Sequence, residues 1–187
     1  FSTALGLETK ASGYSSTAFG QQTKASGFSS TALGNETTAS GDNSTALGTF
    51  TTASGYSSTA LGSLTTASGH YSTAIGSNTI GRSYLSVALG IWNDTIAGSN
   101  PTAWVPTDPL LTVGNGSGAG ARQNAMTIYK NGNTDISGYT RLGTAAESAP
   151  RIKMKEFSST TSGTNNGPIY IAHGLTSSKI ISVEALV

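Results

Sequence analysis

Ser-Thr-Ala-Leu-Gly at Ser2–Gly6, followed by Ala-Ser-Gly at Ala11–Gly13, begins a fourteen-residue pattern that recurs as far as Gly90. The first motif returns, with small variations, at Ser16–Gly20, Ser30–Gly34, Ser44–Gly48, Ser58–Gly62, Ser72–Gly76 and Ser86–Gly90. A short fixed period is typical of solenoids, in which each repeat is one small unit that cannot bury its apolar face alone. The pattern therefore predicts a solenoid over residues 1–90.

The composition of the repeat favours strands. Glycine recurs at the fifth and the twelfth position of the pattern, as at Gly34 and Gly41. Two glycines in fourteen residues disfavour a helix, and glycine is suited to corners with a positive φ. Between the glycines lie short runs of Ser, Thr and Ala with one larger apolar residue, which suits two short strands per turn. Successive turns are expected to stack as parallel strands about 4.8 Å apart.

Alternation along these strands separates an inner face from an outer face. The alanines equivalent to Ala4 and those equivalent to Ala11 are expected to face each other inside the coil. An interior lined by two alanine columns is too thin for large side chains, so the residue after each Ala4 equivalent must point outward. These outward residues, here called the leucine stripe, are Leu5, Phe19, Leu33, Leu47, Leu61, Ile75 and Leu89. A contiguous apolar stripe on a surface indicates a protein interface, and a closed symmetric ring of copies would bury it.

Repeats of the form Ser-x-Ala-x-Gly followed by Ala-x-Gly, with a period of fourteen, resemble the head of YadA-like trimeric autotransporter adhesins. The resemblance covers residues 1 to about 92. It implies a left-handed parallel β-roll, with three rolls packed about one axis and the leucine stripe as the trimer interface. Phage tail fibres and injection-system fibres resemble the same head, so the repeats indicate a fold more strongly than a biological role.

Composition excludes several classes of function. Only 10% of the 187 residues are charged, the net charge is +1, and there is no cysteine. Bulk charge therefore predicts no attraction to nucleic acid, and neither disulfides nor thiolate metal sites can form. We expect no membrane insertion in this segment, since it contains no long apolar run. His70 and His173 are the only histidines and have no spaced metal-ligating partners. The sequence thus predicts neither a cofactor nor enzymatic activity.

Two sets of side chains are candidates for ligand contact. The first is an aromatic series in the turns after the second glycine of each repeat: Tyr14, Phe28, Tyr56, His70 and Tyr71. The second is a cationic face of a strand further along the chain, formed by Arg151, Lys153 and Lys155. Either set could contact sugars or proteins. The alternatives are that the aromatic residues only cover neighbouring turns and that the cations guard a solvated strand edge.

The pattern breaks where Gly81-Arg82-Ser83 replaces Ala-Ser-Gly, and the roll is expected to end within one turn of Gly90. Residues 91–120 are predicted to form a neck or connector. Trp92 and Trp104 would seal the end of the roll there.

Irregular structure is predicted for residues 91–113, where Pro106 and Pro109 interrupt regular hydrogen bonding. The glycine-rich stretch Gly114–Gly120 could in principle cradle a phosphate. A phosphate-binding loop requires a preceding strand and a following helix, which the sequence does not show. The stretch is therefore interpreted as a flexible turn between strands.

Residues 121–143 are predicted to form a β-hairpin. Ala125–Tyr129 suits one strand, Asn131-Gly132 is a strong hairpin turn, and Asn133–Ile136 suits the return strand. The passage from Asp108 to Asn133 resembles the shaft of phage-type tail fibres, which implies hairpins that interleave between three chains. Residues 144–187 are predicted to form a small β tip domain, and whether that domain ends at Val187 stays open.

The expected fold is therefore an all-β homotrimeric fibre, with a β-roll, an intertwined hairpin shaft and a tip. The favoured function is attachment to a host or cell-surface receptor or glycan, as a tail fibre of a phage or of a phage-like contractile injection system. Such a fibre would be extracellular and would also bind a baseplate or fibre-attachment protein. The alternative is the head of a cell-surface adhesin that binds host matrix or glycans, and a third possibility is a spacer without a ligand. Phe1 falls at the last position of a repeat, so we expect a piece of a longer protein.

Overall fold

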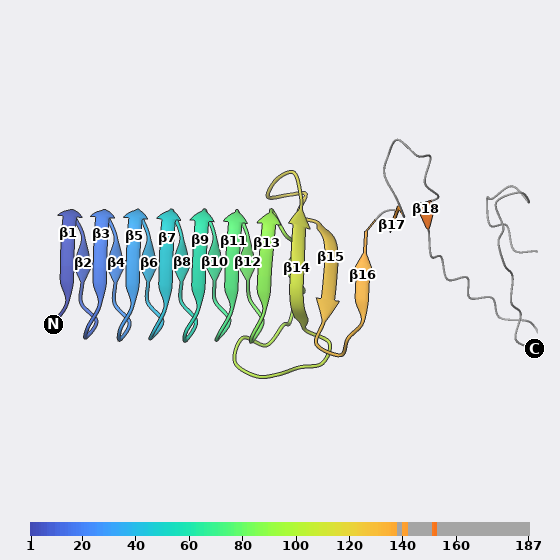
Figure 1. Ribbon diagram of the computed structural model, residues 1–187, viewed down its shortest axis with the longest axis horizontal. Helices are drawn as coiled ribbons and strands as arrows, with labels where there is room; N and C mark the ends of the chain where they lie inside the picture. The colour runs from blue at the N-terminus through green and yellow to red at the C-terminus, as the bar shows by residue number, and fades with distance from the viewer. Residues whose placement is uncertain (138–139, 142–150, 153–187) are drawn as a thin grey trace, which may run out of the picture.

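The computed structural model describes residues 1–137, 140–141 and 151–152, and the regular structure in these residues is all β-strand (Figure 1). Each turn of the solenoid holds a five-residue strand and a two-residue strand. The long strands are β1 (Thr3–Leu7), β3 (Thr17–Gln21), β5 (Thr31–Asn35), β7 (Thr45–Thr49), β9 (Thr59–Ser63), β11 (Thr73–Ser77) and β13 (Val87–Ile91). The short strands are β2 (Lys10–Ala11), β4 (Lys24–Ala25), β6 (Thr38–Ala39), β8 (Thr52–Ala53), β10 (Thr66–Ala67) and β12 (Ile80–Gly81).

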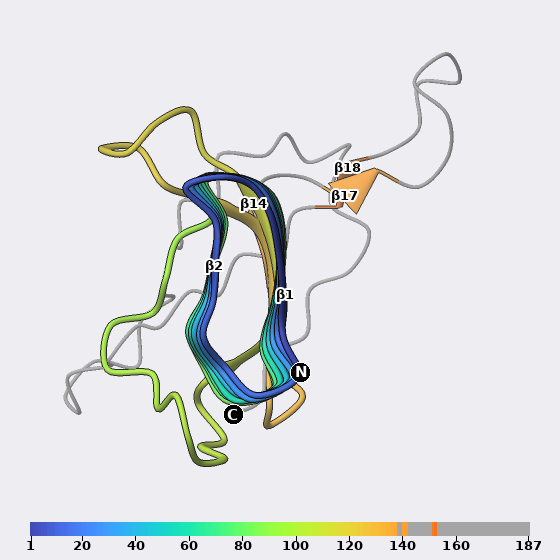
Figure 2. The ribbon, with the colours of Figure 1, turned by 90° about the vertical axis from the view of Figure 1, so that its left-hand side faces the viewer.

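Equivalent residues of successive repeats lie directly beside one another. The long strands pair in parallel, with Ala32 opposite Ala46 and Leu33 opposite Leu47, and the short strands form a second parallel sheet. Viewed along the solenoid, the two sheets form two close walls joined at both ends by corners (Figure 2). The predicted solenoid with two strands per fourteen-residue turn is confirmed.

The interior between the walls is as thin as predicted. The alanines of both columns, from Ala18 to Ala74 and from Ala25 to Ala67, have no exposed surface. The structure adds two polar columns to this core, since the serines equivalent to Ser16 and the threonines equivalent to Thr23 are also buried. Small side chains therefore fill the whole interior and leave no space for a leucine.

The glycines act differently from the sequence-based expectation. In the first column, Gly34 has a φ of +126°, and a Cβ there would lie 1.9 Å from a carbonyl oxygen of the next turn. In the second column, Gly41 has no positive φ, but a Cβ would lie 2.1 Å from the next turn. The left-handed corner positions belong instead to variable residues such as Glu36 (φ 50°) and Asn43 (φ 57°). Close stacking of turns, rather than corner geometry alone, thus requires the glycines.

The roll gains one further parallel strand after Gly90, within the one turn expected, and residues 91–113 are not wholly irregular. Strand β14 (Pro109–Asn115) pairs in parallel with β13, with Val87 opposite Leu111 and Gly90 opposite Gly114. The intervening loop lengthens this turn from fourteen residues to twenty-four, which hides the repeat in the sequence. The predicted flexible turn at Gly114–Gly120 is wrong at its start, because Gly114 and Asn115 belong to β14.

The predicted hairpin forms from β15 (Asn124–Tyr129) and β16 (Thr134–Ile136), and Gly132 adopts a φ of 89° in its turn. Strand β15 pairs antiparallel with β14 of the same chain, so the hairpin extends the long-strand sheet to ten strands (Figure 1). This differs from the interleaved arrangement expected for a shaft. A separate pair joins β17 (Thr140–Arg141) to β18 (Arg151–Ile152). The predicted tip lies otherwise outside the described residues.

Candidate interaction surfaces

The leucine stripe runs along the outer face of the long-strand sheet. Each member from Phe19 to Leu89 lies next to a buried alanine and points the opposite way, because successive side chains of a strand alternate between faces. Leu5, Phe19 and Ile75 are 60%, 51% and 39% exposed, and the other members are half-buried. The structure therefore places all seven predicted residues in one outward apolar column of a single chain.

The aromatic edge is the second surface, and it lies at the corner between each short strand and the next long strand. The rings of Tyr14 and Phe28 stack with their centroids 5.5 Å apart and their planes 8° apart. Tyr56 contacts both His70 and Tyr71, with centroids 6.1 Å and 5.4 Å away. The structure thus brings the predicted aromatic residues together in two groups.

Asp42 separates the two groups of the aromatic edge, and its carboxylate accepts a hydrogen bond of 2.8 Å from the backbone N–H of Phe28. Tyr84 extends the second group by an edge-to-face contact with Tyr71, at 5.8 Å. Sequence reasoning missed Tyr84, although it holds the position of Tyr14 in the repeat that begins to diverge. Tyr14 and Phe28 therefore cover one another's inner faces, whereas the rings of the second group meet at a tilt or edge to face.

The loop from 92 to 108 covers the C-terminal end of the aromatic edge. The backbone N–H groups of His70 and Tyr84 donate to the carbonyl oxygens of Pro101 and Asn100, at 2.8 and 2.9 Å. These N–H groups hold the position at which Phe28 donates to the Asp42 carboxylate, so the loop supplies the acceptors there. In Figure 2 the loop runs beside the wall that contains β2 and projects beyond the lower corner of the roll.

Lys130 joins this loop to the hairpin. Its ammonium lies 5.3 Å from the ring centre of Trp104 and 5.7 Å from that of Tyr84, and 3.8 Å from the Asp108 carboxylate. The Lys130 side chain is buried, and removal from water lowers the pKa of its ammonium, while the negative charge of Asp108 partly opposes that shift. A cation between two rings and a carboxylate stabilises the packing of the loop, since both kinds of contact favour the charged form.

Trp92 and Trp104 lie at the end of the roll, but at different corners. The Arg122 guanidinium lies 4.9 Å from the ring centre of Trp92, and it donates hydrogen bonds to the carbonyl oxygens of Asn78 and Asn93. Arg122 thus covers Trp92 at one corner, whereas Trp104 contacts Lys130 at the other corner and is 52% exposed.

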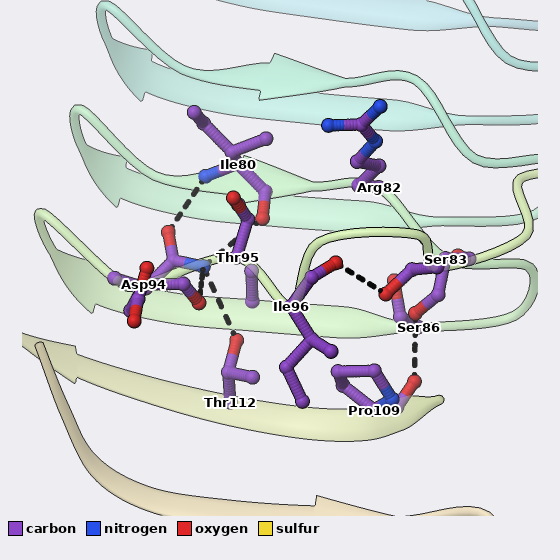
Figure 3. Close-up of a pocket in the computed structure, with 12 residues that line it drawn as sticks. Ile80, Arg82, Ser83, Ser86, Asp94, Thr95, Ile96, Pro109 and Thr112 are labelled. Atoms are coloured by element: carbon purple, nitrogen blue, oxygen red, sulfur yellow. Dashed lines mark hydrogen bonds between the residues drawn. The ribbon is translucent and has the colours of Figure 1, made fainter. Parts of the chain in front are cut away.

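Asn93 closes the short-strand sheet where it ends at Ile80. Its side-chain oxygen accepts a 2.7 Å hydrogen bond from the Ile80 N–H, and its amide nitrogen donates to the Ile80 carbonyl oxygen at 3.0 Å. The amide therefore replaces the peptide group that a further strand would offer. The adjacent hollow, lined by Thr95 and Pro109 among others (Figure 3), has room for about one water molecule. It is too small to be a ligand pocket.

The cationic candidates are only partly described. Arg151 lies in β18, opposite Arg141 of β17, while its side chain and the residues Lys153 and Lys155 lie outside the described residues. Within the described part of the chain, no group of three or more His, Asp or Glu side chains could hold a metal ion. The same residues include no helix long and apolar enough to cross a membrane.

A two-walled parallel β-roll with a small-residue core and an outer apolar stripe is the class of structure that the first half of the chain defines. Residues 1–23, 25–51 and 53–79 match the family model of the YadA head domain repeat. No curated protein matches the chain. The N-terminal region is therefore built from YadA head domain repeats, which confirms that part of the predicted resemblance.

Proposed function

We propose that the chain is a trimeric attachment fibre, in which three rolls pack along their leucine stripes and present the aromatic edge to a cell-surface receptor or glycan. YadA head repeats imply a trimeric, adhesin-like function, and YadA-type adhesins bind host surface components. The observation that carries the proposal is the outward leucine column over an interior already filled by alanine. Water would surround this column in a lone chain, whereas a ring of copies removes it from water.

A mass measurement tests the trimer. Light scattering on the purified chain should give about three times the 18.8 kDa of one copy. A monomer at all accessible concentrations would contradict the proposal.

Within this class, we favour the tail fibre of a phage or a phage-like contractile injection system, held by a baseplate or fibre-attachment protein. This choice rests on the sequence resemblance of the passage from Asp108 to Asn133 to fibre shafts, although its hairpin pairs within one chain. The alternative, the head of a cell-surface adhesin, is supported by the match of the repeats. Immunogold imaging with an antibody against the roll discriminates between them, since label on tailed particles supports the fibre and label on the bacterial envelope supports the adhesin.

The aromatic edge is proposed as the receptor contact, and the role of the fibre as adhesive rather than enzymatic. Replacing Tyr56 and Tyr71 by alanine should reduce binding to receptor-bearing cells at least tenfold while the trimer stays intact. Ser54→Ala is a suitable control, because Ser54 is exposed and takes no part in the ring contacts. Unchanged cell binding by the double variant would show that the rings only cover neighbouring turns.

A further inference from the structure

The outer face of the roll continues without interruption across the hairpin. Cross-strand partners share a face of a sheet, and the register places Leu89 opposite Val113, Val113 opposite Met126, and Met126 opposite Ile136. The last member, Ile136, is 54% exposed. The apolar column that begins at Leu5 therefore extends three strands beyond the repeats, through β14, β15 and β16 (Figure 1).

A second apolar column appears beside the first at this end of the sheet. In the repeats the neighbouring outward position is threonine, from Thr3 to Thr73. From β13 onward the same position holds Val87, Leu111 and Ile128 in paired register. The outer face thus widens from one apolar column to two where the sequence repeats end.

The two faces of the hairpin differ in polarity. On the side opposite the apolar columns, the Tyr129 hydroxyl donates a 2.8 Å hydrogen bond to the Asp135 carboxylate, which raises the pKa of Tyr129. On that side Thr127 is buried and its hydroxyl is bonded by the Asn124 amide. Polar groups are therefore paired on one face, while the other carries aliphatic side chains and Thr134, with no charge.

We propose that the outer face of β13–β16, here called the hairpin face, packs against the same face of two other copies of this chain. The hairpin face consists of Val87, Leu89, Leu111, Val113, Met126, Ile128, Thr134 and Ile136. This inference rests on the trimer proposed above, and it assigns the widest and most apolar part of the interface to a segment outside the matched repeats. Continuity of the column with the leucine stripe and the absence of charge on the hairpin face favour identical copies as the occupant, since residues close to a three-fold axis meet their own counterparts.

Single cysteines test this arrangement, because the chain has none of its own. Leu47→Cys reports on the leucine stripe and Met126→Cys on the hairpin face, while Asp135→Cys lies on the opposite side of the same hairpin. Each variant is treated with a short bismaleimide at a protein concentration at which the wild type is trimeric. The products are separated by denaturing electrophoresis. We expect a covalent dimer from the first two variants at comparable yield, and at least tenfold less from the third.

The outcomes separate this inference from the proposed function. Cross-linking of Leu47→Cys without Met126→Cys would overturn the hairpin face and leave the trimer standing. Failure of both, in folded chains, would overturn both proposals, and equal cross-linking of Asp135→Cys would overturn a face-specific contact. As a second measurement, Met126→Lys should raise the trimer dissociation constant at least tenfold, whereas Asp135→Lys should change it less than threefold.

Discussion

Replacing Leu47 by serine is expected to weaken the association of copies while leaving the roll folded. Leu47 is already half-buried in a single chain, and its neighbour Ala46 is fully buried on the inner face. Burying the rest of one leucine contributes about 1 kcal/mol, or roughly half of the value for full burial. Three copies together would lose about 3 kcal/mol, which corresponds to an increase of roughly 100-fold in the trimer dissociation constant.

Sedimentation equilibrium over a series of concentrations measures that constant, and urea unfolding at low concentration measures the stability of the separated chain. The matched control is Ala46→Leu, one residue away on the opposite face. Its larger side chain must enter the filled interior, and overpacking of this kind costs about 1–3 kcal/mol or more of the free energy of unfolding. Leu47→Ser should change that free energy by about 1 kcal/mol or less, because only part of the side chain is buried in the separated chain.

The opposite pattern would refute the reasoning. If Leu47→Ser left association unchanged and lowered the free energy of unfolding by about 2–5 kcal/mol, Leu47 would behave as a residue of a monomer core. The stripe would then not be an interface, and the proposal of a trimeric fibre would lose its main support.

Three further predictions concern the roll and its end. Gly34→Ala should lower the urea midpoint strongly, since the strained φ alone costs about 1–3 kcal/mol and the new Cβ overlaps the next turn, whereas the exposed Ser40→Ala should not. Asn93→Leu should lower the free energy of unfolding by about 2–3 kcal/mol, because two hydrogen bonds to Ile80 are lost. The Ile80 amide should also exchange its hydrogen faster. An unchanged exchange rate would contradict the role of Asn93 in closing the edge of the short-strand sheet. Because the pKa of Lys130 is lowered, the folded state binds fewer protons than the unfolded state between that pKa and about 10.4. The free energy of unfolding of the wild type, relative to that of Lys130→Met, should therefore rise with pH in that window. A flat or falling difference would contradict burial of the ammonium.

The repeats could be read from the sequence because each one has the same small set of neighbours. Ala32 contacts the equivalent alanines above and below, so the alternation within one strand already assigns the inner and outer faces. The leucine stripe and the first five aromatic residues were predicted for the same reason. The role of the second glycine column was not, because it depends on how closely two turns approach rather than on the conformation of one residue.

The end of the roll could not be read in this way. The loop before β14 displaces the repeat by ten residues, so Leu111-Thr112-Val113-Gly114 matches Val87-Ala88-Leu89-Gly90 only after the chain has folded back. No sequence pattern predicts the role of Asn93 either, since its amide bonds the edge of the short-strand sheet at Ile80 only in the folded chain. The surroundings of Lys130 also arise only on folding, because two aromatic rings and Asp108 from distant parts of the chain lie beside it.

The sequence by itself determined the fourteen-residue turn, its two strands, its alanine interior and the outward direction of its leucines, because these follow from alternation and from a strict period. Only the tertiary structure decided that β14 and the hairpin continue the same sheet and that the apolar column runs on to Ile136. The physical reason is that a strand that follows a long loop pairs with the free sheet edge that lies beside it in the folded chain. Local sequence patterns do not encode that edge.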